Sequence, residues 1–176
     1  MPRSTAKRPV SEWLRVAWPS LAGGIAAAGL LLWGAASDRF VAGLQRALAY
    51  STDAVLRLFG QATTVVDTTV QSGHFGITVV TACTGLFATG LFVIAVAAFP
   101  TRWRAKAVGA AIGIVGLYAI NVIRLVSLYF VGVHWPGILD AVHQLVWQSL
   151  LIALAVALWL LWAARAPRGQ SNRRAS

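Results

Sequence analysis

Residues 79–99, VVTACTGLFATGLFVIAVAAF, join a β-branched segment to an apolar run long enough to enter a membrane. The first three residues favour an extended backbone, and the residues after them form an almost unbroken apolar stretch. The only cysteine of the chain, Cys83, lies at this boundary. We therefore expect a strand to end near Thr81 and a membrane helix to begin with Cys83 in its first turn.

The composition of the whole chain is that of an integral membrane protein. Hydrophobic residues make up 58% of the 176 positions and charged residues only 11%, whereas the surface of a soluble domain requires more charge. One cysteine excludes an internal disulfide, and no group of Cys and His residues has zinc-site spacing. We expect no metal and no other cofactor. The net charge of +10 arises from basic residues beside apolar runs, which indicates the lipid bilayer and not nucleic acid as the partner.

Four apolar stretches are long enough to cross a membrane as helices, which takes about 20 residues each. They are residues 16–36, 82–99, 108–131 and 142–164. The expected fold class is therefore an all-α polytopic membrane protein with about four transmembrane helices. We expect residues 1–164 to form a single membrane-embedded domain and residues 165–176 to form a disordered basic tail. A signal peptide is the alternative for the first stretch, although that stretch exceeds the usual length of an apolar signal region.

The basic residues predict the orientation of these spans. Eleven of the fifteen Lys and Arg residues lie in three clusters: Arg3, Lys7, Arg8 and Arg15 before the first span, Arg102, Arg104 and Lys106 between the second and third, and Arg165, Arg168, Arg173 and Arg174 after the fourth. Loops rich in Lys and Arg remain in the cytoplasm. We therefore predict a multi-pass protein of the inner (cytoplasmic) membrane with both termini in the cytoplasm and residues 37–81 on the periplasmic or external side.

The external segment contains two expected structures. Apolar residues recur at helical spacing between residues 40 and 59, which predicts an amphipathic helix on the outer membrane face. They are Val41, Leu44, Leu48, Val55 and Leu58. Seven of the eight residues 63–70 are β-branched, QSGH then favours a turn, and residues 77–81 are β-branched throughout. This pattern predicts a short β-hairpin before the second span.

Cys83 is the first candidate catalytic residue. If Thr81 caps the following helix, the unpaired N–H groups of the first turn lie near the thiol and favour the thiolate, which is the attacking form. The alternative is a small buried apolar residue, because most free cysteines behave in that way.

Arg124 lies within the third apolar stretch, in NVIRLVSLYF, about eight residues or 12 Å from its outer end. An arginine inside a membrane helix costs about 2.5–3.5 kcal/mol and usually serves a function, and its long side chain can reach the boundary. The alternative is a structural arginine paired with Asp67 or Asp140. Asn121 lies one turn earlier, where it can position Arg124, bind a substrate carbonyl or form a plain interhelical hydrogen bond.

The fourth stretch opens with LDAVHQLVWQSL and places His143 in the first turn at the outer face. Histidine donates and accepts protons near neutrality, although an interfacial histidine bonded to a backbone carbonyl is an equal alternative. Asp140 is expected to cap this helix, with orientation of His143 as a second possible role. His134 and His74 also lie in external turns, and spacing alone does not choose among the three histidines.

Separate spans thus bring a thiol, a guanidinium and an imidazole to one membrane boundary. A thiolate beside a histidine is the nucleophile and acid–base pair needed for acyl transfer, and an arginine can stabilise the oxyanion. Two other function classes stay open: a small transporter or channel subunit in which Arg124 binds an anion and Cys83 is inert, and a non-catalytic assembly protein with a structural arginine. An intramembrane cysteine protease that only hydrolyses is a third possibility.

These residues resemble the signature of the exosortase/archaeosortase family of membrane-embedded cysteine transpeptidases. The motifs stand here as ACTGL, NVIR and VHQ, within residues 63–164. The resemblance implies that the catalytic residues are Cys83, Arg124 and His143, with supporting roles for Asn121, Thr84 and Asp140. Many family members have more spans, so the chain resembles a minimal four-span member such as the exosortase H type.

The resemblance also implies a substrate class and a reaction. Family members act on exported proteins whose C-terminal sorting signal consists of a short motif, a transmembrane helix and a basic cluster. They cleave near the motif through a cysteine thioester and transfer the protein to an acceptor. The expected active site faces the periplasm or exterior, and the sequence leaves both the motif and the acceptor open.

Overall fold

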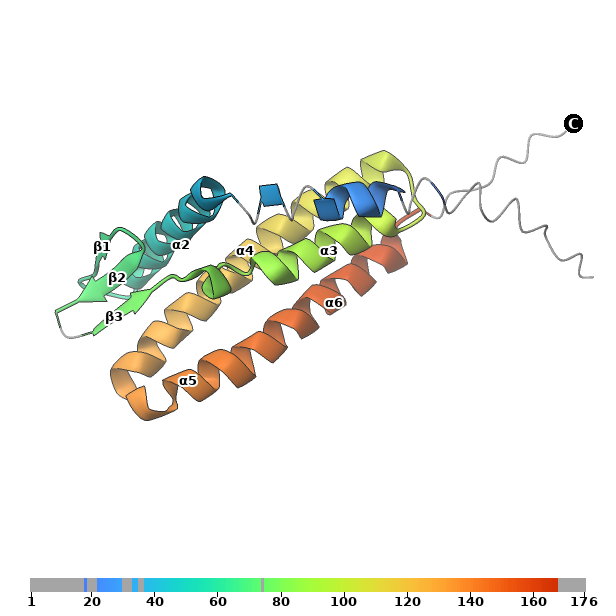
Figure 1. Cartoon of the computed structure of the whole chain (residues 1–176). Coiled ribbons are helices and arrows are strands. Elements are labelled where there is room, and N and C mark those ends of the chain that lie inside the picture. The colour runs from blue at the N-terminus through green and yellow to red at the C-terminus, as the bar shows by residue number, and fades with distance from the viewer. Residues whose placement is uncertain (1–17, 19–21, 30–32, 35–36, 74, 168–176) are drawn as a thin grey trace, which may run out of the picture.

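The computed structural model describes residues 18, 22–29, 33–34, 37–73 and 75–167. It is mostly helical, with a small sheet at one end of a helical bundle (Figure 1). The elements are α2 (Asp38–Leu58), β1 (Thr64–Val66), β2 (Thr69–Ser72), β3 (Phe75–Thr78), η1 (Thr81–Thr84), α3 (Leu86–Ala98), α4 (Trp103–His134), η2 (Pro136–Ile138), α5 (Leu139–Ala141), η3 (Val142–Trp147) and α6 (Gln148–Arg165). η1 is a 3-10 turn and η3 is π-helical.

Within the described residues, two helical stretches are long and apolar enough to cross a membrane, namely α4 and the stretch Pro136–Arg165. α3 is equally apolar but has 13 residues, about 20 Å of helix, which is less than the roughly 30 Å of a hydrocarbon core. Of the predicted first span, residues 16–36, the described residues 18, 22–29 and 33–34 are helical and the others lie outside the described residues. The predicted tail, residues 165–176, is described only as far as residue 167. The architecture is that of a helical membrane protein, and the count of four spans stays a prediction.

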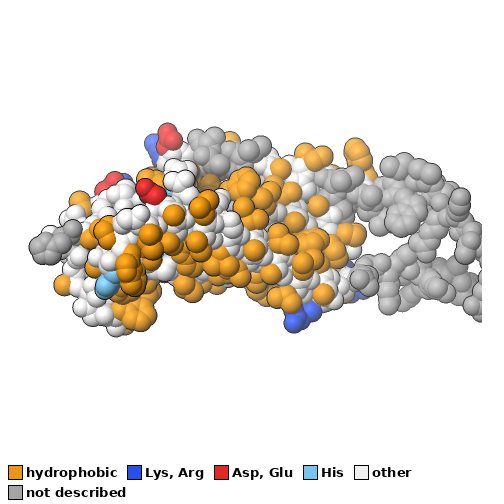
Figure 2. Space-filling view, turned by 90° about the horizontal axis from the view of Figure 1, so that it is seen from below, with side chains coloured by type: hydrophobic (Ala, Val, Ile, Leu, Met, Phe, Trp, Pro, Cys, Tyr) orange, Lys and Arg blue, Asp and Glu red, His pale blue; other side chains and the backbone are white. Residues whose placement is uncertain are grey.

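The surface of the bundle carries a broad apolar face along the helices (Figure 2). α6 contributes large exposed side chains to the surface, including Ile152, Val156, Leu160 and Leu161. Such a face is unfavourable in water and is typical of contact with lipid. Small residues let the helices pack closely inside the bundle. At Gly113 of α4, for example, the Phe92 ring of α3 fills the space that a side chain would need.

α2 confirms the predicted amphipathic helix, and its apolar face packs on the protein. Leu48 and Leu56 are fully buried against β2 and the C-terminal half of α4, in a core cluster with Val70, Leu125 and Tyr129. The predicted placement of Leu58 on this face is wrong, since Leu58 is 86% exposed. The helical period places Leu56 on the buried face instead.

The sheet has three antiparallel strands in the order β1-β2-β3, so the prediction of a two-stranded hairpin was incomplete. The β-branched run 63–70 does not form one strand, because the chain reverses at Asp67, whose φ is 55°. Aspartate is one of the few residues besides glycine that adopt this conformation. Its carboxylate also pairs with Arg46 at 3.3 Å. The one predicted turn, at QSGH, is confirmed, since Ser72 pairs with Phe75.

Buried polar contacts join the end of α2 to the start of the sheet. The carboxylate of Asp53 accepts a hydrogen bond from Thr63 Oγ1 at 2.6 Å and pairs with Arg57 Nε at 2.9 Å. Arg57 Nη2 also donates to the Thr63 carbonyl oxygen at 2.8 Å. Because Asp53 and Thr63 are buried, these bonds fix the angle at which the sheet leaves α2.

Candidate active site

Cys83 lies in η1 and not in the first turn of α3. After β3 the Val79 N–H donates to the Thr68 carbonyl at 2.9 Å, Val80 stays extended, and the Cys83 N–H closes the 3-10 turn onto the Val80 carbonyl at 2.8 Å. The predicted start of the membrane helix is therefore too early, because α3 begins only at Leu86. The helical run is interrupted where Gly85 adopts a left-handed conformation with a φ of 68°.

The predicted cap by Thr81 is wrong, and Thr84 makes the joining hydrogen bonds. Thr84 Oγ1 donates to the Thr81 carbonyl oxygen at 2.7 Å and accepts from the Leu86 N–H at 3.3 Å. Thr84 is 5% exposed. Its hydroxyl thus connects the turn that carries Cys83 to the first residue of α3, where the helix has an otherwise unpaired N–H group.

Asn121 of α4 holds the same turn from the side. Its Nδ2 donates to the Cys83 carbonyl oxygen at 2.7 Å, and the Asn121 side chain is buried. Gly85 permits this approach, since a Cβ at Gly85 would lie 3.2 Å from Asn121 Cγ. Gly85 had no predicted role. A glycine between a polar turn and an apolar helix is the sequence signal for a junction of this kind, where a turn ends and a new helix begins.

His143 is the histidine that meets the cysteine. Its Nε2 lies 3.4 Å from Cys83 Sγ, within hydrogen-bonding range for sulfur. His143 is half-buried and belongs to the π-helical η3, and Cys83 is 3% exposed. π-helical turns inside longer helices are frequent at functional sites. The contact is compatible with a thiol that donates to the imidazole or with an imidazole N–H that donates to a thiolate.

Arg124 completes the group from α4. It is 1% exposed and lies one turn after Asn121, whose side chain bonds the Cys83 carbonyl oxygen. Arg124 Nε has no hydrogen-bond partner within the described part of the chain. Neither carboxylate proposed as its structural partner forms an ion pair with it there, and Asp67 pairs with Arg46 instead. A buried charge without a protein partner is costly, so this site is suited to an oxyanion or a carbonyl oxygen.

Asp140 does not cap the last membrane helix. It is exposed and is the second residue of α5, whose N-cap position is Ile138 without a side-chain cap. Over residues 75–167 no hydrogen bond or ion pair joins Asp140 to His143. The predicted cap fails because the chain continues helically from η2 through α5 and η3 into α6, so that no free helix start remains at Asp140.

The other two histidines have different positions. His134 is the last residue of α4 and is exposed, and its Nδ1 lies 2.9 Å from the Phe130 carbonyl oxygen. It was expected on a turn, but α4 extends three residues beyond the predicted span, which ended at 131. His74 lies outside the described residues. Among those described, no group of three or more His, Cys, Asp or Glu side chains is arranged for a metal ion.

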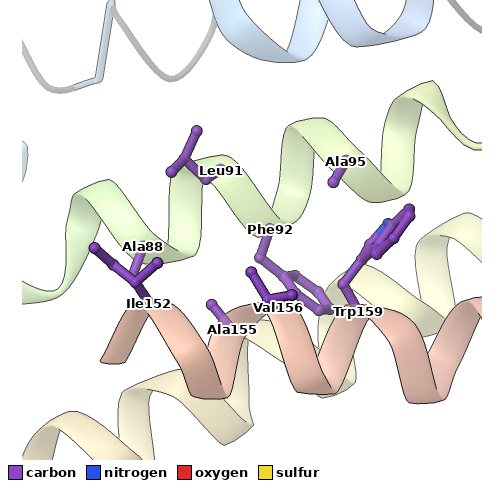
Figure 3. A pocket seen from close by; sticks show the side chains of 8 residues that line it. All are labelled: Ala88, Leu91, Phe92, Ala95, Ile152, Ala155, Val156 and Trp159. Atoms are coloured by element: carbon purple, nitrogen blue, oxygen red, sulfur yellow. The ribbon is translucent and has the colours of Figure 1, made fainter. Parts of the chain in front are cut away.

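An apolar groove of about 260 Å³ runs between α3 and α6 (Figure 3). It is lined by Ala88, Leu91, Phe92, Ala95, Ile152, Ala155, Val156 and Trp159. Ala88 and Ile152 lie at one end of the groove, and they are its lining residues nearest in sequence to Cys83 and His143. The helices α3 and α6 thus border an almost entirely apolar hollow, in which the indole N–H of Trp159 is the one polar side-chain group.

Comparison with protein families gave one match. The model of the transmembrane exosortase family matches residues 11–147, which is well over half of the chain. The matched region contains Cys83, Asn121, Arg124 and His143. Comparisons with curated proteins and with solved structures gave no match.

Proposed function

Because the chain belongs to the transmembrane exosortase family, we propose that it is a membrane cysteine transpeptidase that cleaves the C-terminal sorting signals of exported proteins. Membership alone points to a membrane transpeptidase in general. The observation that carries the finer proposal is the 3.4 Å contact between Cys83 Sγ and His143 Nε2. A thiol and an imidazole in contact form the pair needed for nucleophilic attack and proton transfer.

The first half of the proposed reaction forms a thioester. Cys83 Sγ attacks the carbonyl carbon of the scissile peptide bond while His143 Nε2 accepts the thiol proton. The carbonyl oxygen becomes an oxyanion, which the Arg124 guanidinium stabilises. When the C–N bond breaks, His143 returns the proton to the departing amine. The exported protein is then held as an acyl group on Cys83.

The second half releases the protein. An acceptor nucleophile attacks the thioester carbonyl, His143 removes its proton, and the Cys83 thiolate leaves and is protonated again. An amine or hydroxyl acceptor gives transfer, whereas water gives hydrolysis. Asn121 and Thr84 act through the turn that carries Cys83, since both bond within or onto that turn. Asp140 has no assigned role in these steps.

The proposed substrates are exported proteins that end in a short motif, a transmembrane helix and a basic cluster. The groove between α3 and α6 offers the substrate helix an apolar surface, and α3 follows the turn that carries Cys83. The enzyme is a protein of the inner membrane with both termini in the cytoplasm. Its active site faces the periplasm or exterior. A substrate helix in the same orientation has its motif at the depth of Cys83.

Co-expression with an exported reporter tests this function. The reporter ends in a candidate sorting signal, and its processing is followed in isolated membranes with and without neutral hydroxylamine, which cleaves thioesters. We expect the wild-type chain to shorten the reporter and to yield the hydroxamate when hydroxylamine replaces the natural acceptor. Cys83→Ser should give neither product, because a hydroxyl is a much weaker nucleophile without a dedicated base.

The same assay separates the other function classes. Reporter shortened without any hydroxamate indicates that water attacks directly, which would contradict a thioester route. Equal processing by wild-type and Cys83→Ser chains would place the activity elsewhere in the cell and leave Cys83 inert, as in a transporter subunit or an assembly protein.

A further inference from the structure

β3 is an edge strand that leads directly to Cys83. The order β1-β2-β3 gives β3 one neighbour, and nothing else in the described residues pairs with its other side. Only four residues separate Thr78, the end of β3, from Cys83. Figure 1 shows β3 running into the turn before α3. The free edge of β3 is therefore connected to the proposed nucleophile by a short and well-ordered path.

The strand register defines which backbone groups face this edge. In an antiparallel pair, hydrogen-bonded residues alternate with residues whose N–H and C=O groups point away from the partner strand. The Val79 N–H donates to the Thr68 carbonyl, so Ile77, two residues earlier, bonds to β2 opposite Val70. Gly76 and Thr78 therefore direct their N–H and C=O groups to the free edge.

The exposure of these residues agrees with the register. Gly76 and Thr78 are exposed, whereas Phe75 and Ile77 are partly buried against the core. No turn, loop or side-chain hydrogen bond within residues 37–73 and 75–167 uses the backbone of Gly76 or Thr78. Gly76 also lacks a side chain that would keep a neighbouring chain at a distance. The edge thus presents two donors and two acceptors in the geometry of a strand.

We propose that the free edge of β3 binds the substrate segment that precedes the cleaved bond, as a fourth strand of the sheet. This proposal rests on the proposed transpeptidase function. Main-chain hydrogen bonds to Gly76 and Thr78 hold the segment extended, about 4.8 Å from β3. β3 lies on one side of η1 and α3 lies on the other (Figure 1). The exported part of the substrate therefore pairs with β3, while its membrane helix continues along the bundle.

Disulfide cross-linking tests the strand directly. Cys83 is the only cysteine, so the Cys83→Ser variant offers a cysteine-free background into which Thr78→Cys is introduced. The probe is the reporter processed by the wild-type chain, with single cysteines at successive positions before the cleaved bond. After oxidation with copper phenanthroline in membranes, we expect cross-links at every second reporter position. Side chains alternate across a strand, and those opposite each other have Cβ atoms about 5 Å apart.

Thr64→Cys in the same background is the matched control. Thr64 is also an exposed threonine of the sheet, but it lies on β1, at the opposite edge. It should give no cross-links above background. Any of three results would overturn the strand proposal. Thr78→Cys gives equal cross-links at consecutive reporter positions, Thr78→Cys gives no cross-links, or Thr64→Cys gives as many cross-links as Thr78→Cys. Processing of the same reporter by the wild-type chain tests the proposed function separately.

A proline at Thr78 removes one donor from the edge without removing a ladder bond to β2. We expect Thr78→Pro to lower kcat/KM for the reporter about tenfold, which corresponds to the loss of about one hydrogen bond. Thr78→Ala is the control, because it loses the same bond between the Thr78 and Thr69 hydroxyls but keeps the backbone N–H. Equal kcat/KM values for the two variants, at equal thermal stability, would contradict the proposal.

Discussion

At the residue scale, the site joins groups that are remote in sequence. Cys83 and His143 are 60 residues apart in the chain and 3.4 Å apart in the structure. Arg124 lies one turn of α4 after Asn121 and is buried, with its Nε unpaired within the described part of the chain. These three residues could be predicted from sequence, because polar groups in apolar helices are few and all three fall at one predicted boundary.

The arginine should not be replaceable by lysine. An ammonium group lacks the planar fork of donors that can bind an oxyanion while remaining fixed by its surroundings. We expect Arg124→Lys to reduce kcat for the reporter about 100-fold or more, with normal amounts of folded protein in the membrane. Arg46→Lys is the control, since Arg46 is exposed and pairs with Asp67, and it should keep near-normal turnover. A fully active Arg124→Lys variant would dismiss the oxyanion role.

Of the two described histidines, only His143 should be essential. His143→Ala removes the group that accepts and returns the proton, so we expect turnover to fall about 100-fold or more. His134→Ala should keep most of the activity, because His134 contacts a backbone carbonyl at the end of α4. Initial rates of reporter processing check both variants. An inactive His134→Ala beside an active His143→Ala would reverse the assignment.

The details around these residues were less predictable. Thr81 and Asp140 were assigned as caps from their positions before apolar runs, but capping depends on where the backbone actually becomes helical. In the structure Thr84 bonds across the start of α3, and the helical path through η2 and α5 leaves Asp140 no cap position. The two wrong cap predictions do not affect the proposed roles of Cys83, Arg124 and His143.

At the element scale, the junction between η1 and α3 holds the thiol in place. Gly85 adopts a φ of 68° and lies against Asn121, which in turn bonds the Cys83 carbonyl. An L-residue in this conformation costs about 1–2 kcal/mol, and the added methyl group would push Asn121 away. The junction therefore links α4 to the position of Cys83.

Gly85→Ala should lower both thermal stability and reporter processing, because strain and displacement of Asn121 act on the same turn. The matched control is Gly43→Ala, since a Cβ at Gly43 of α2 meets nothing within 4 Å. Alanine also favours a helix by about 1 kcal/mol relative to glycine, so Gly43→Ala should be neutral or stabilising. Thermal unfolding in detergent and processing in membranes measure the two effects. If Gly85→Ala has the wild-type thermal stability and the wild-type rate of reporter processing, the junction does not hold Cys83 in place.

The elements were predictable to different degrees. α2 and the apolar helices follow from periodicity and length, which depend on local sequence. The three-stranded sheet did not follow, because seven β-branched residues in eight conceal the reversal at Asp67, and only the left-handed conformation of that residue reveals it. The late start of α3 was missed for a similar reason, since Gly85 lies inside an otherwise continuous run.

At the scale of the whole molecule, the proposed orientation depends on charge. The sheet lies at one end of the bundle, and α6 ends at the other (Figure 1). Arg102, Arg104 and Arg165 flank the ends of α3, α4 and α6 away from the sheet. The positive-inside rule assigns that end to the cytoplasm.

Reporter fusions test the orientation. A periplasmically active enzyme fused after Ala36 should be active, whereas the same enzyme fused after Ser176 should be inactive. A cytoplasmic reporter at the two sites should give the opposite result. Activity of the periplasmic reporter only at the second site would place Cys83 on the cytoplasmic side and contradict the proposed access of exported substrates.

The central claim is that Cys83 carries the exported protein as a thioester, and mass spectrometry of the Cys83 peptide tests it most directly. Membranes that contain the wild-type chain and the reporter are quenched in acid, which preserves thioesters, and are then digested. The account predicts a Cys83 peptide linked to the new C-terminus of the reporter, removed by neutral hydroxylamine and missing in His143→Ala. Continued processing of the reporter by a chain whose Cys83 is blocked or replaced by serine would contradict it.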